Sequence, residues 1–263
     1  MKSIKKVLTI AGSDCSGGAG IQADIKTITT HKMYAMSVIT ALTAQNTTGV
    51  FGVIDVDPDF VSRQIDCVFN DIYPDAVKIG MVSSAEIIAV IAERLAHYEM
   101  QNIVLDPVMV ATSGGKLMKN GAADALIKLM FPVSSIITPN MAEAGVIAGI
   151  EIKTKADMEC AVKIISKLTG SAILLKGGHL ENCADDLLYN ANEMVWLTGK
   201  RIETENTHGT GCTLSSAIAC NLANGFTILE SVKNAKEYLA GALSYKGFDV
   251  GHGSGPLYHC YNM

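Results

Sequence analysis

The chain lacks the features that would direct it to nucleic acid, to a membrane or out of the cell. Its 263 residues contain 21 Lys and Arg against 26 Asp and Glu, so the net charge of −5 leaves no positive surplus for a polyanion. The apolar run at residues 7–11 is too short for the core of a signal peptide, and no later run could span a bilayer. The seven cysteines contain no C-x-x-C pair, which argues against a disulfide framework. We therefore expect a cytoplasmic protein without nucleic-acid or membrane partners.

Two familiar motifs for nucleotide binding are also missing. The glycine-rich segment 17–20 (GGAG) is not the G-x-x-x-x-G-K-[ST] loop, and it does not extend to G-x-G-x-x-G. A tight turn between a strand and a helix and a loop that closes over a small ligand are equally good interpretations of it. His179 and His208 have no second histidine at the spacing of a metal site, which favours structural roles for both.

What the sequence does contain is a regular alternation of strands and helices. The predicted strands are residues 6–11, 36–42, 53–56, 76–79, 103–105, 135–137 and 172–175, with a small meander around 195–197, and the predicted helices begin near residues 21, 57, 84, 122, 141, 157, 213 and 229. Strands separated by helices imply a mostly parallel sheet that is covered on both faces. Because the chain has no repeat, low-complexity tract or linker, we expect residues 1–263 to form a single α/β domain.

Polar residues and glycines follow several predicted strands, at the edge where α/β sheets bind ligands. They are Gly12, Ser13 and Asp14 after the first strand, and Gly80, Asp106, Asn140 and Lys176 after later strands. Asn140 and Glu143 could cap a helix or hold Mg²⁺ through water, and Asp106 could cap a loop or lie beside a metal and a phosphate. Lys176 could be solvated or could bind phosphate. Asp24, one turn from the glycine segment, could be a solvated carboxylate or a hydrogen-bond partner of a substrate.

The strongest functional signal is the segment 206–212 (NTHGTGC), which precedes a helix of small and apolar residues. Glycines at alternate positions let successive N–H groups converge, and the helix adds its positive end, so Gly209 and Gly211 predict a site for a phosphate or a developing negative charge. Cys212 follows directly, and a thiol at a helix N-terminus has a lowered pKa that suits a base or a nucleophile. A redox role for this thiol lacks a neighbouring resolving cysteine in the sequence.

Taken in order, these segments resemble the ribokinase-like superfamily of small-molecule kinases, and more closely the hydroxymethylpyrimidine/phosphomethylpyrimidine kinases of thiamine biosynthesis. The matching segments, which span nearly the whole chain, are residues 11–14, 16–24, 37–47, 78–81, 106–109, 137–140, 176–179 and 207–212. The resemblance implies a three-layer α/β/α sandwich with a mostly parallel central sheet. It also implies ATP and Mg²⁺ as cofactors, and phosphorylation of 4-amino-5-hydroxymethyl-2-methylpyrimidine and then of its monophosphate. A vitamin B6 kinase on the same scaffold and a non-catalytic pyrimidine sensor are the alternatives.

The resemblance further implies a role for each matching position. Cys212 would be catalytic, in the place where many sugar kinases carry an aspartate base, and Gly209 and Gly211 would line the anion hole. Gln45 would pair with the pyrimidine edge, in a pocket completed by Asp24, Gly12, Met81 and Val108. ATP would be bound by Asp106, Thr138, Asn140, Glu143 and Lys176, with Mg²⁺ held by Glu143 and Asp106 through water.

Two positions depart from the family pattern, and both lie in predicted loops. Cys15 stands where relatives often have proline or serine, which should change the stiffness of its loop more than the chemistry. Segment 112–116 (TSGGK) is typical of a mobile flap, but Thr112 stands where a lysine is common, and Lys116 is the residue that could supply the missing charge. We expect a small-molecule substrate and a homodimer.

Overall fold

The computed structural model describes residues 3–109, 118–178, 180 and 183–263, so His179 and the segment predicted to form a flap lie outside the described residues. Within them, nine strands form one continuous sheet. They are β1 (Lys6–Asp14), β2 (Tyr34–Asn46), β3 (Gly49–Asp55), β4 (Ala76–Ile79), β5 (Ile103–Leu105), β6 (Ile136–Ile137), β7 (Ala172–Leu175), β8 (Asp186–Asn190) and β9 (Glu193–Leu197). Their spatial order is β3-β2-β1-β4-β5-β6-β7-β8-β9.

The central strands of this sheet are parallel, and the strands at its two edges are antiparallel. β2, β1, β4, β5, β6 and β7 pair in parallel, whereas β3 pairs antiparallel with β2, and β8 and β9 continue antiparallel from β7. The predicted mostly parallel sheet is therefore confirmed. β2 runs on past the predicted end to Asn46, where its side chain accepts a hydrogen bond from the Thr48 N–H at 2.8 Å and turns the chain into a hairpin with β3.

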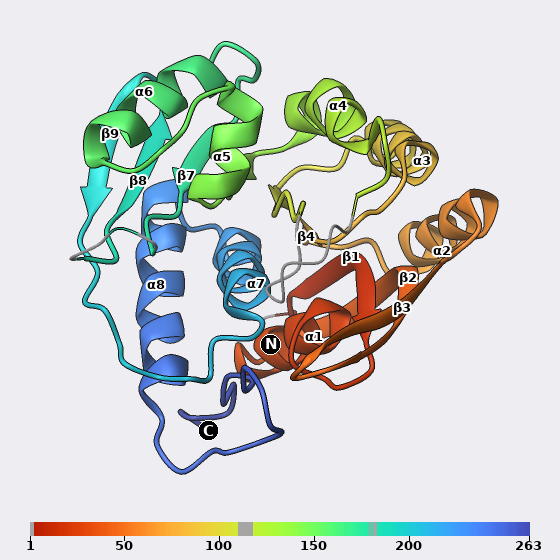
Figure 1. Ribbon diagram of the computed structural model, residues 1–263. Helices are drawn as coiled ribbons and strands as arrows, with labels where there is room; N and C mark the ends of the chain where they lie inside the picture. The colour runs from red at the N-terminus through yellow and green to blue at the C-terminus, as the bar shows by residue number, and fades with distance from the viewer. Residues whose placement is uncertain (1–2, 110–117, 179, 181–182) are drawn as a thin grey trace.

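Helices cover both faces of the sheet and complete the three layers (Figure 1). One face carries α2 (Pro58–Asp71), α3 (Ala85–His97), α4 (Ala122–Ala125) with the π-turn η1 (Leu126–Met130) and the 3₁₀-turn η2 (Phe131–Val133), α5 (Met141–Ala148) and α6 (Lys155–Ile165). The other carries α1 (Gly20–Thr30), α7 (Thr210–Ala223) and α8 (Ile228–Ser244). No helix in the described part of the chain is long and apolar enough to cross a membrane.

Alternation along the strands divides the core between the two faces. In β1, Leu8 and Ile10 belong to the cluster under α2 and α3, whereas Val7 belongs to the cluster formed by Ile28 of α1 and Leu214 of α7. Successive strand side chains point to opposite faces, so a strand that is apolar throughout fits a sheet that is covered on both sides. Burying each of these side chains contributes roughly 1.5–3 kcal/mol.

The prediction of one continuous α-helix over residues 122–129 is wrong, although the whole segment is helical in a broader sense. Only Ala122–Ala125 is α-helical, and the chain continues as the wider turn Leu126–Met130 before it reaches Phe131 and Pro132. Phe131 keeps α-helical dihedral angles and Pro132 lies within the 3₁₀-turn, so the chain leaves helical geometry only at Ser134, which is extended.

A buried ion pair ties helices on one face to the middle of the sheet. Nζ of Lys78 in β4 lies 2.9 and 2.8 Å from the two carboxylate oxygens of Asp24 in α1, and neither side chain is exposed. Asp24 also accepts hydrogen bonds from Thr9 at 2.6 Å and from Ser216 of α7 at 2.8 Å. Burial acts to lower the pKa of Lys78, but the charges of Asp24, Cys212 and Asp106 and the hydrogen bond to Asp24 together raise that pKa. Removing one partner of such a pair costs roughly 3–5 kcal/mol, so the pair fixes α1 and α7 against β1 and β4.

Candidate active site

The carboxyl ends of the parallel strands open into one cavity of about 1180 Å³. Its wall contains Asp14 at the end of β1, Asp106 after β5 and Lys176 after β7, together with the first turn of α7. The predicted strand-end residues Gly12, Asp106, Asn140 and Lys176 are thus brought together, whereas Gly80 does not belong to the lining. This is the edge at which α/β sheets bind ligands, and the cavity runs along it from β2 to β9.

The turn that starts α7 has the geometry of an anion-binding site. Gly209 precedes the helix with φ 85° and ψ 8°, and a Cβ there would lie 1.9 Å from the carbonyl oxygen of Gly18, so only glycine fits. The first N–H groups of a helix have no partner inside the helix and carry its positive end. A Cβ on Gly211 would lie 3.2 Å from Asp106 Oδ2 and 3.4 Å from Lys176 Nζ, so this turn faces the two charged residues at the ends of β5 and β7.

Asp106 and Lys176 form a buried ion pair in the wall of the cavity. Lys176 Nζ lies 2.9 Å from Asp106 Oδ1, and the Thr138 hydroxyl donates to the same oxygen at 3.1 Å. Burial acts to raise the pKa of Asp106, but the charges of Lys176 and Lys78 and the hydrogen bonds from Lys176 and Thr138 together lower that pKa. Burial acts to lower the pKa of Lys176, and the charges of Asp106 and Glu143 raise it instead. Both groups therefore stay charged at neutral pH.

Thr138 does not meet the cavity, contrary to the prediction that it binds ATP directly. Its side chain is fully buried, it is absent from the lining, and its hydroxyl bonds Asp106. The residue supports a charged neighbour instead of contacting a ligand.

Asn140 and Glu143 cap α5 and also line the cavity. The Asn140 side chain accepts from the Glu143 N–H, and the Glu143 carboxylate accepts from the Asn140 N–H, both at 2.8 Å. This reciprocal arrangement is the capping box that the sequence left as one of two interpretations. Burial raises the pKa of Glu143, Asp106 raises it further and Lys176 opposes the change.

The carboxylates fit a magnesium ion that is shared with a ligand rather than held by protein alone. No group of three His, Cys, Asp or Glu side chains that could hold a metal occurs in the described ranges of the chain. Mg²⁺ in proteins is held by one or two carboxylates together with water and the phosphates of a substrate. Asp106 and Glu143 offer oxygen ligands of this kind in the wall of the cavity.

The predicted lowered pKa of Cys212 is wrong. The side chain is half-buried and lines the cavity, and loss of solvent raises its pKa to about 11. Lys78 acts in the opposite direction, but the carboxylates of Asp24 and Asp106 raise the pKa further. Cys212 is therefore a thiol at neutral pH.

The other predicted substrate residues divide into four that line the cavity and one that does not. Gly12, Gln45, Met81 and Val108 all belong to the lining. Asp24 does not, because both its oxygens are occupied in the buried pair with Lys78. We therefore correct the expectation that Asp24 hydrogen-bonds a substrate: its place one turn after the glycine segment is right, but it points into the protein.

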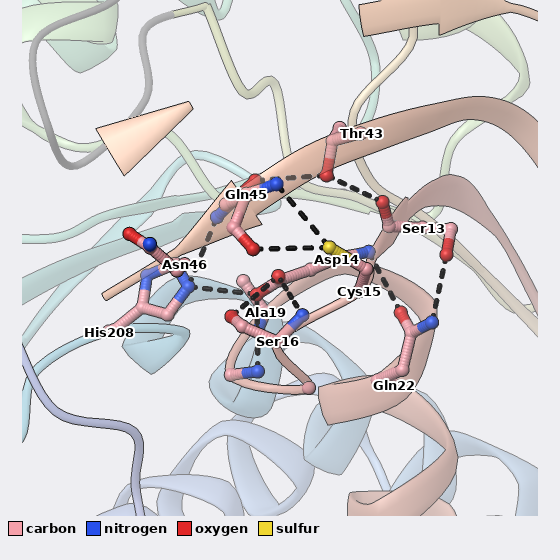
Figure 2. Close-up of polar contacts among 12 residues, drawn as sticks. Ser13, Asp14, Cys15, Ser16, Ala19, Gln22, Thr43, Gln45, Asn46 and His208 are labelled. Atoms are coloured by element: carbon pink, nitrogen blue, oxygen red, sulfur yellow. Dashed lines mark hydrogen bonds and ion pairs between the residues drawn. The ribbon is translucent and has the colours of Figure 1, made fainter. Parts of the chain in front are cut away.

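Asp14 and His208 form a polar centre in the site (Figure 2). The sequence analysis placed Asp14 at the ligand edge of the sheet but gave it no role, and it favoured a structural role for His208. Asp14 Oδ1 accepts from the N–H and hydroxyl of Ser16 at 2.9 and 2.7 Å. Its Oδ2 accepts from the N–H groups of Gly18 and Ala19 at 3.1 and 2.8 Å, and lies 2.9 Å from His208 Nε2. The acid that follows a buried strand and precedes a glycine segment was a usable signal for the loop, but nothing local linked it to His208.

The far end of the cavity was also missed. Along α8, Lys233, Lys236, Ala240 and Leu243 line it, and residues 197–202 after β9 lie beside them. The spacing of three and four residues places the α8 side chains on one face, a pattern that a helix packed against a sheet shows equally well.

The comparisons with known proteins agree with this geometry. Residues 14–258 match the family model described as phosphomethylpyrimidine kinase. The chain is 49% identical over 255 residues to the hydroxymethylpyrimidine/phosphomethylpyrimidine kinase of Rhizobium meliloti, which covers 96% of each chain. A crystal structure of phosphomethylpyrimidine kinase from Clostridium difficile is similar with a TM-score of 0.81 and 48% identity, covering 91% of this chain and 99% of that one.

A second class of solved structures has the same fold. The pyridoxal kinase from Staphylococcus aureus, solved in complex with AMP-PCP and pyridoxal, is similar with a TM-score of 0.91 and 35% identity, covering 99% of this chain and 95% of that one. The three-layer fold and the site thus define a small-molecule kinase of the ribokinase-like type. Within that class, the chain belongs to the phosphomethylpyrimidine kinase family.

Through the carboxylate of Asp14, the free energy of unfolding should depend on pH in the acidic range. Burial acts to raise its pKa, but hydrogen bonds from His208, Ser16 and Ala19 lower it from 3.8 to about 2. Because the folded-state pKa is the lower one, the stabilisation is present above the unfolded-state pKa and is lost as pH falls towards about 2. The shift corresponds to about 2 kcal/mol. Urea unfolding at pH 5.5 and pH 3 should therefore show a steeper loss for wild type than for Asp14→Asn.

The control for this measurement removes a negative charge from an exposed position. Asp59→Asn, in the first turn of α2, should keep the pH dependence of the wild type. Equal pH dependence in wild type and Asp14→Asn would contradict the role assigned to Asp14.

Proposed function

We propose that this protein transfers the γ-phosphoryl group of ATP to the hydroxymethyl group of 4-amino-5-hydroxymethyl-2-methylpyrimidine, and then phosphorylates the monophosphate, in thiamine biosynthesis. One observation carries the proposal: the glycine turn that starts α7 faces the Asp106–Lys176 pair inside the cavity that also contains Gln45. The family of the chain, and the names of the relatives that it matches over nearly its whole length, support the same reaction.

Phosphoryl transfer asks a protein mainly for alignment and for neutralisation of charge. We place the transferred phosphoryl at the N–H groups of the turn formed by Gly209, Gly211 and Cys212, where the helix adds its positive end. Lys176 would bind phosphate oxygens, and Asp106 and Glu143 would hold Mg²⁺ through water. Asn140 completes this wall of the cavity. The magnesium ion, when bound, would neutralise charge on the phosphates.

Cys212 lies at the start of the same turn, where it can meet the hydroxyl of an incoming alcohol. Since burial keeps it a thiol at neutral pH, its sulfur already carries a hydrogen, and we assign it only an orienting contact to that hydroxyl. The proton of the alcohol would pass, late in the reaction, to an oxygen of the transferred phosphoryl group. A loose transition state builds little charge on the attacking oxygen, so a weak acceptor suffices.

The substrate ring would lie at the β1–β2 end of the cavity. Met81 and Val108 supply apolar contacts, Gly12 leaves room beside Met81, and Gln45 offers an amide to the ring edge. The same end of the cavity would accept a pyridine ring, so phosphorylation of vitamin B6 is the alternative function.

The test of this function is an ADP-release assay with two alcohols and one phosphate ester. We expect turnover with the aminopyrimidine alcohol and with its monophosphate, and a kcat/KM for pyridoxine at least about tenfold lower, because Gln45 can pair with an amino-substituted edge. Preference for pyridoxine would assign the protein to the vitamin B6 kinases. Tight pyrimidine binding without ADP release would assign it to the sensors. Either result would contradict the proposal.

We further propose that residues 1–263 form one domain, that the protein is cytoplasmic and that it is a homodimer through the β2–β3 hairpin. Leu42 and Ile54 are paired across the two strands and are 51% and 72% exposed, and Phe51 beside them is 71% exposed. β3 is an edge strand with a free side. Exposed apolar edges of this kind favour association with another chain.

Sedimentation velocity tests the dimer. Wild type should sediment as a dimer and Ile54→Asp as a monomer, because a charge in the middle of the apolar hairpin would have to be buried without a partner. Val146→Asp on α5 is the matched control, since Val146 is 67% exposed but lies outside the hairpin, and it should remain a dimer. A monomeric wild type, or dissociation of both variants alike, would contradict the assignment.

A further inference from the structure

His208 connects the glycine loop, the substrate end of the cavity and the anion turn. It is the residue directly before Gly209, its ring contacts Asp14 in the loop after β1, and it lies beside Gln45 at the end of β2 (Figure 2). A Cβ on Gly18 would lie 2.3 Å from the His208 ring, so the loop packs closely against it. Three segments that are distant in the sequence therefore meet at one imidazole.

The hydrogen-bond partners of His208 show which of its two ring nitrogens carries a hydrogen. Asp14 is a carboxylate with acceptors only, so the contact of 2.9 Å to His208 Nε2 requires a hydrogen on Nε2. This holds whether the ring is neutral or doubly protonated, because a bare Nε2 would set two acceptors against each other. Four further donors, the N–H groups of Ser16, Gly18 and Ala19 and the Ser16 hydroxyl, keep the carboxylate in place.

The same reasoning determines which end of the Gln45 side-chain amide faces His208. Gln45 Nε2 lies 3.2 Å from His208 Nε2, and Gln45 Oε1 lies 3.2 Å from the Thr43 hydroxyl oxygen. The nitrogen and oxygen of a glutamine have the same shape, so their hydrogen bonds decide which is which. Because His208 Nε2 carries a hydrogen, an amide NH₂ group beside it would set two donors against each other. The amide nitrogen and oxygen must therefore be exchanged, so that the oxygen shares, in a three-centre contact, the hydrogen that Nε2 donates to Asp14.

Thr43 supplies the partner for the other end of the amide. Its single hydroxyl hydrogen is donated to the Ser13 carbonyl at 2.8 Å, which leaves the Thr43 oxygen to accept from the Gln45 NH₂ group. The backbone of Gln45 is held as well, because Cys15 Sγ lies 3.1 Å from its carbonyl oxygen and 3.4 Å from its nitrogen. With one N–H given to Thr43 and one lone pair to His208, the amide keeps one N–H and one lone pair for a ligand.

We infer that Asp14, acting through His208, fixes which way round the Gln45 amide faces and so sets the order of donor and acceptor that the site offers to the ring of its substrate. Asp14 and His208 are positioning residues for specificity. An aminopyrimidine presents a ring-nitrogen acceptor beside an amino donor, which matches the remaining N–H and lone pair of Gln45. The inference rests on the proposed function, because it takes a ring of this kind to bind beside Gln45.

The sharpest test compares two alcohols that differ only in the order of donor and acceptor. They are 4-amino-5-hydroxymethyl-2-methylpyrimidine and its 4-oxo analogue, in which N3 carries a hydrogen and O4 accepts. A fixed amide should favour the amino compound in kcat/KM by roughly 10- to 100-fold, the discrimination of a good bidentate pair. In His208→Phe the amide can rotate and pair with either compound, so this preference should fall to within about threefold of unity.

Gln22→Ala is the matched control. Gln22 accepts from the Asp14 N–H and donates to Ser13, so it holds the same loop without touching Gln45. It should change turnover with both alcohols in the same ratio and leave the preference intact. Thr43→Val, which removes the acceptor at the other end of the amide, should reduce the preference as His208→Phe does, and it replaces that variant if the latter does not fold.

A measurement without turnover separates this inference from the proposed function. In ¹⁵N–¹H spectra of the wild-type protein, the His208 ring should show a hydrogen on Nε2 at neutral pH. A bare Nε2, or an unchanged preference in His208→Phe, would overturn the inference. Absence of ADP release with both alcohols would remove the proposed function, and the state of Nε2 would still decide whether Asp14 fixes the ring and the amide.

Discussion

Five donors converge on the buried carboxylate of Asp14, and the architecture of the site depends on this arrangement. Four of them belong to the loop between β1 and α1, which would otherwise leave its N–H groups without partners at the base of the cavity. The fifth belongs to His208, the residue before the anion turn. One carboxylate at the end of one strand therefore sets the position of the loop, of the first turn of α7 and of Gln45 relative to each other. These parts come from residues 14–20, 45 and 208–212. The relative positions of the substrate and the phosphoryl group therefore depend on contacts between segments that are distant in the sequence.

Charge in the rest of the site is organised as buried pairs, and these pairs set the chemistry of Cys212. Lys78 is neutralised by Asp24 below the turn, and Lys176 is neutralised by Asp106 beside it. Neither lysine is therefore free to hold a second anion at the thiol, and burial keeps Cys212 protonated. The positive potential that remains at the turn comes from the end of the helix. In the proposed mechanism it acts on the transferred phosphoryl group rather than on the sulfur.

The sequence was sufficient for the features that repeat along the chain and for those carried by contiguous residues. The alternation of apolar runs predicted the layered fold, and the glycines before α7 predicted the anion turn, because both are local patterns. Contacts between distant residues could not be predicted. Asp24 was close to the glycine segment in sequence, but only the position of Lys78 shows that it points inward. The pKa of Cys212 depended on burial and on two carboxylates from other segments. His208 had no neighbouring histidine to mark it, and its role depends on Asp14, 194 residues earlier.

The central claim is that Cys212 meets the alcohol at the anion turn while ATP is bound by other groups. Steady-state turnover together with an ATP binding isotherm for Cys212→Ala tests it most directly, with Cys220→Ala, eight residues further along α7 and buried in the core, as the control. The account predicts that Cys212→Ala lowers kcat by roughly 10- to 100-fold, because the alcohol loses its orienting contact. It also predicts that the Kd for ATP changes by less than about threefold and that Cys220→Ala retains both values. A kcat for Cys212→Ala close to that of the wild type, or an equal loss of ATP binding, would contradict it.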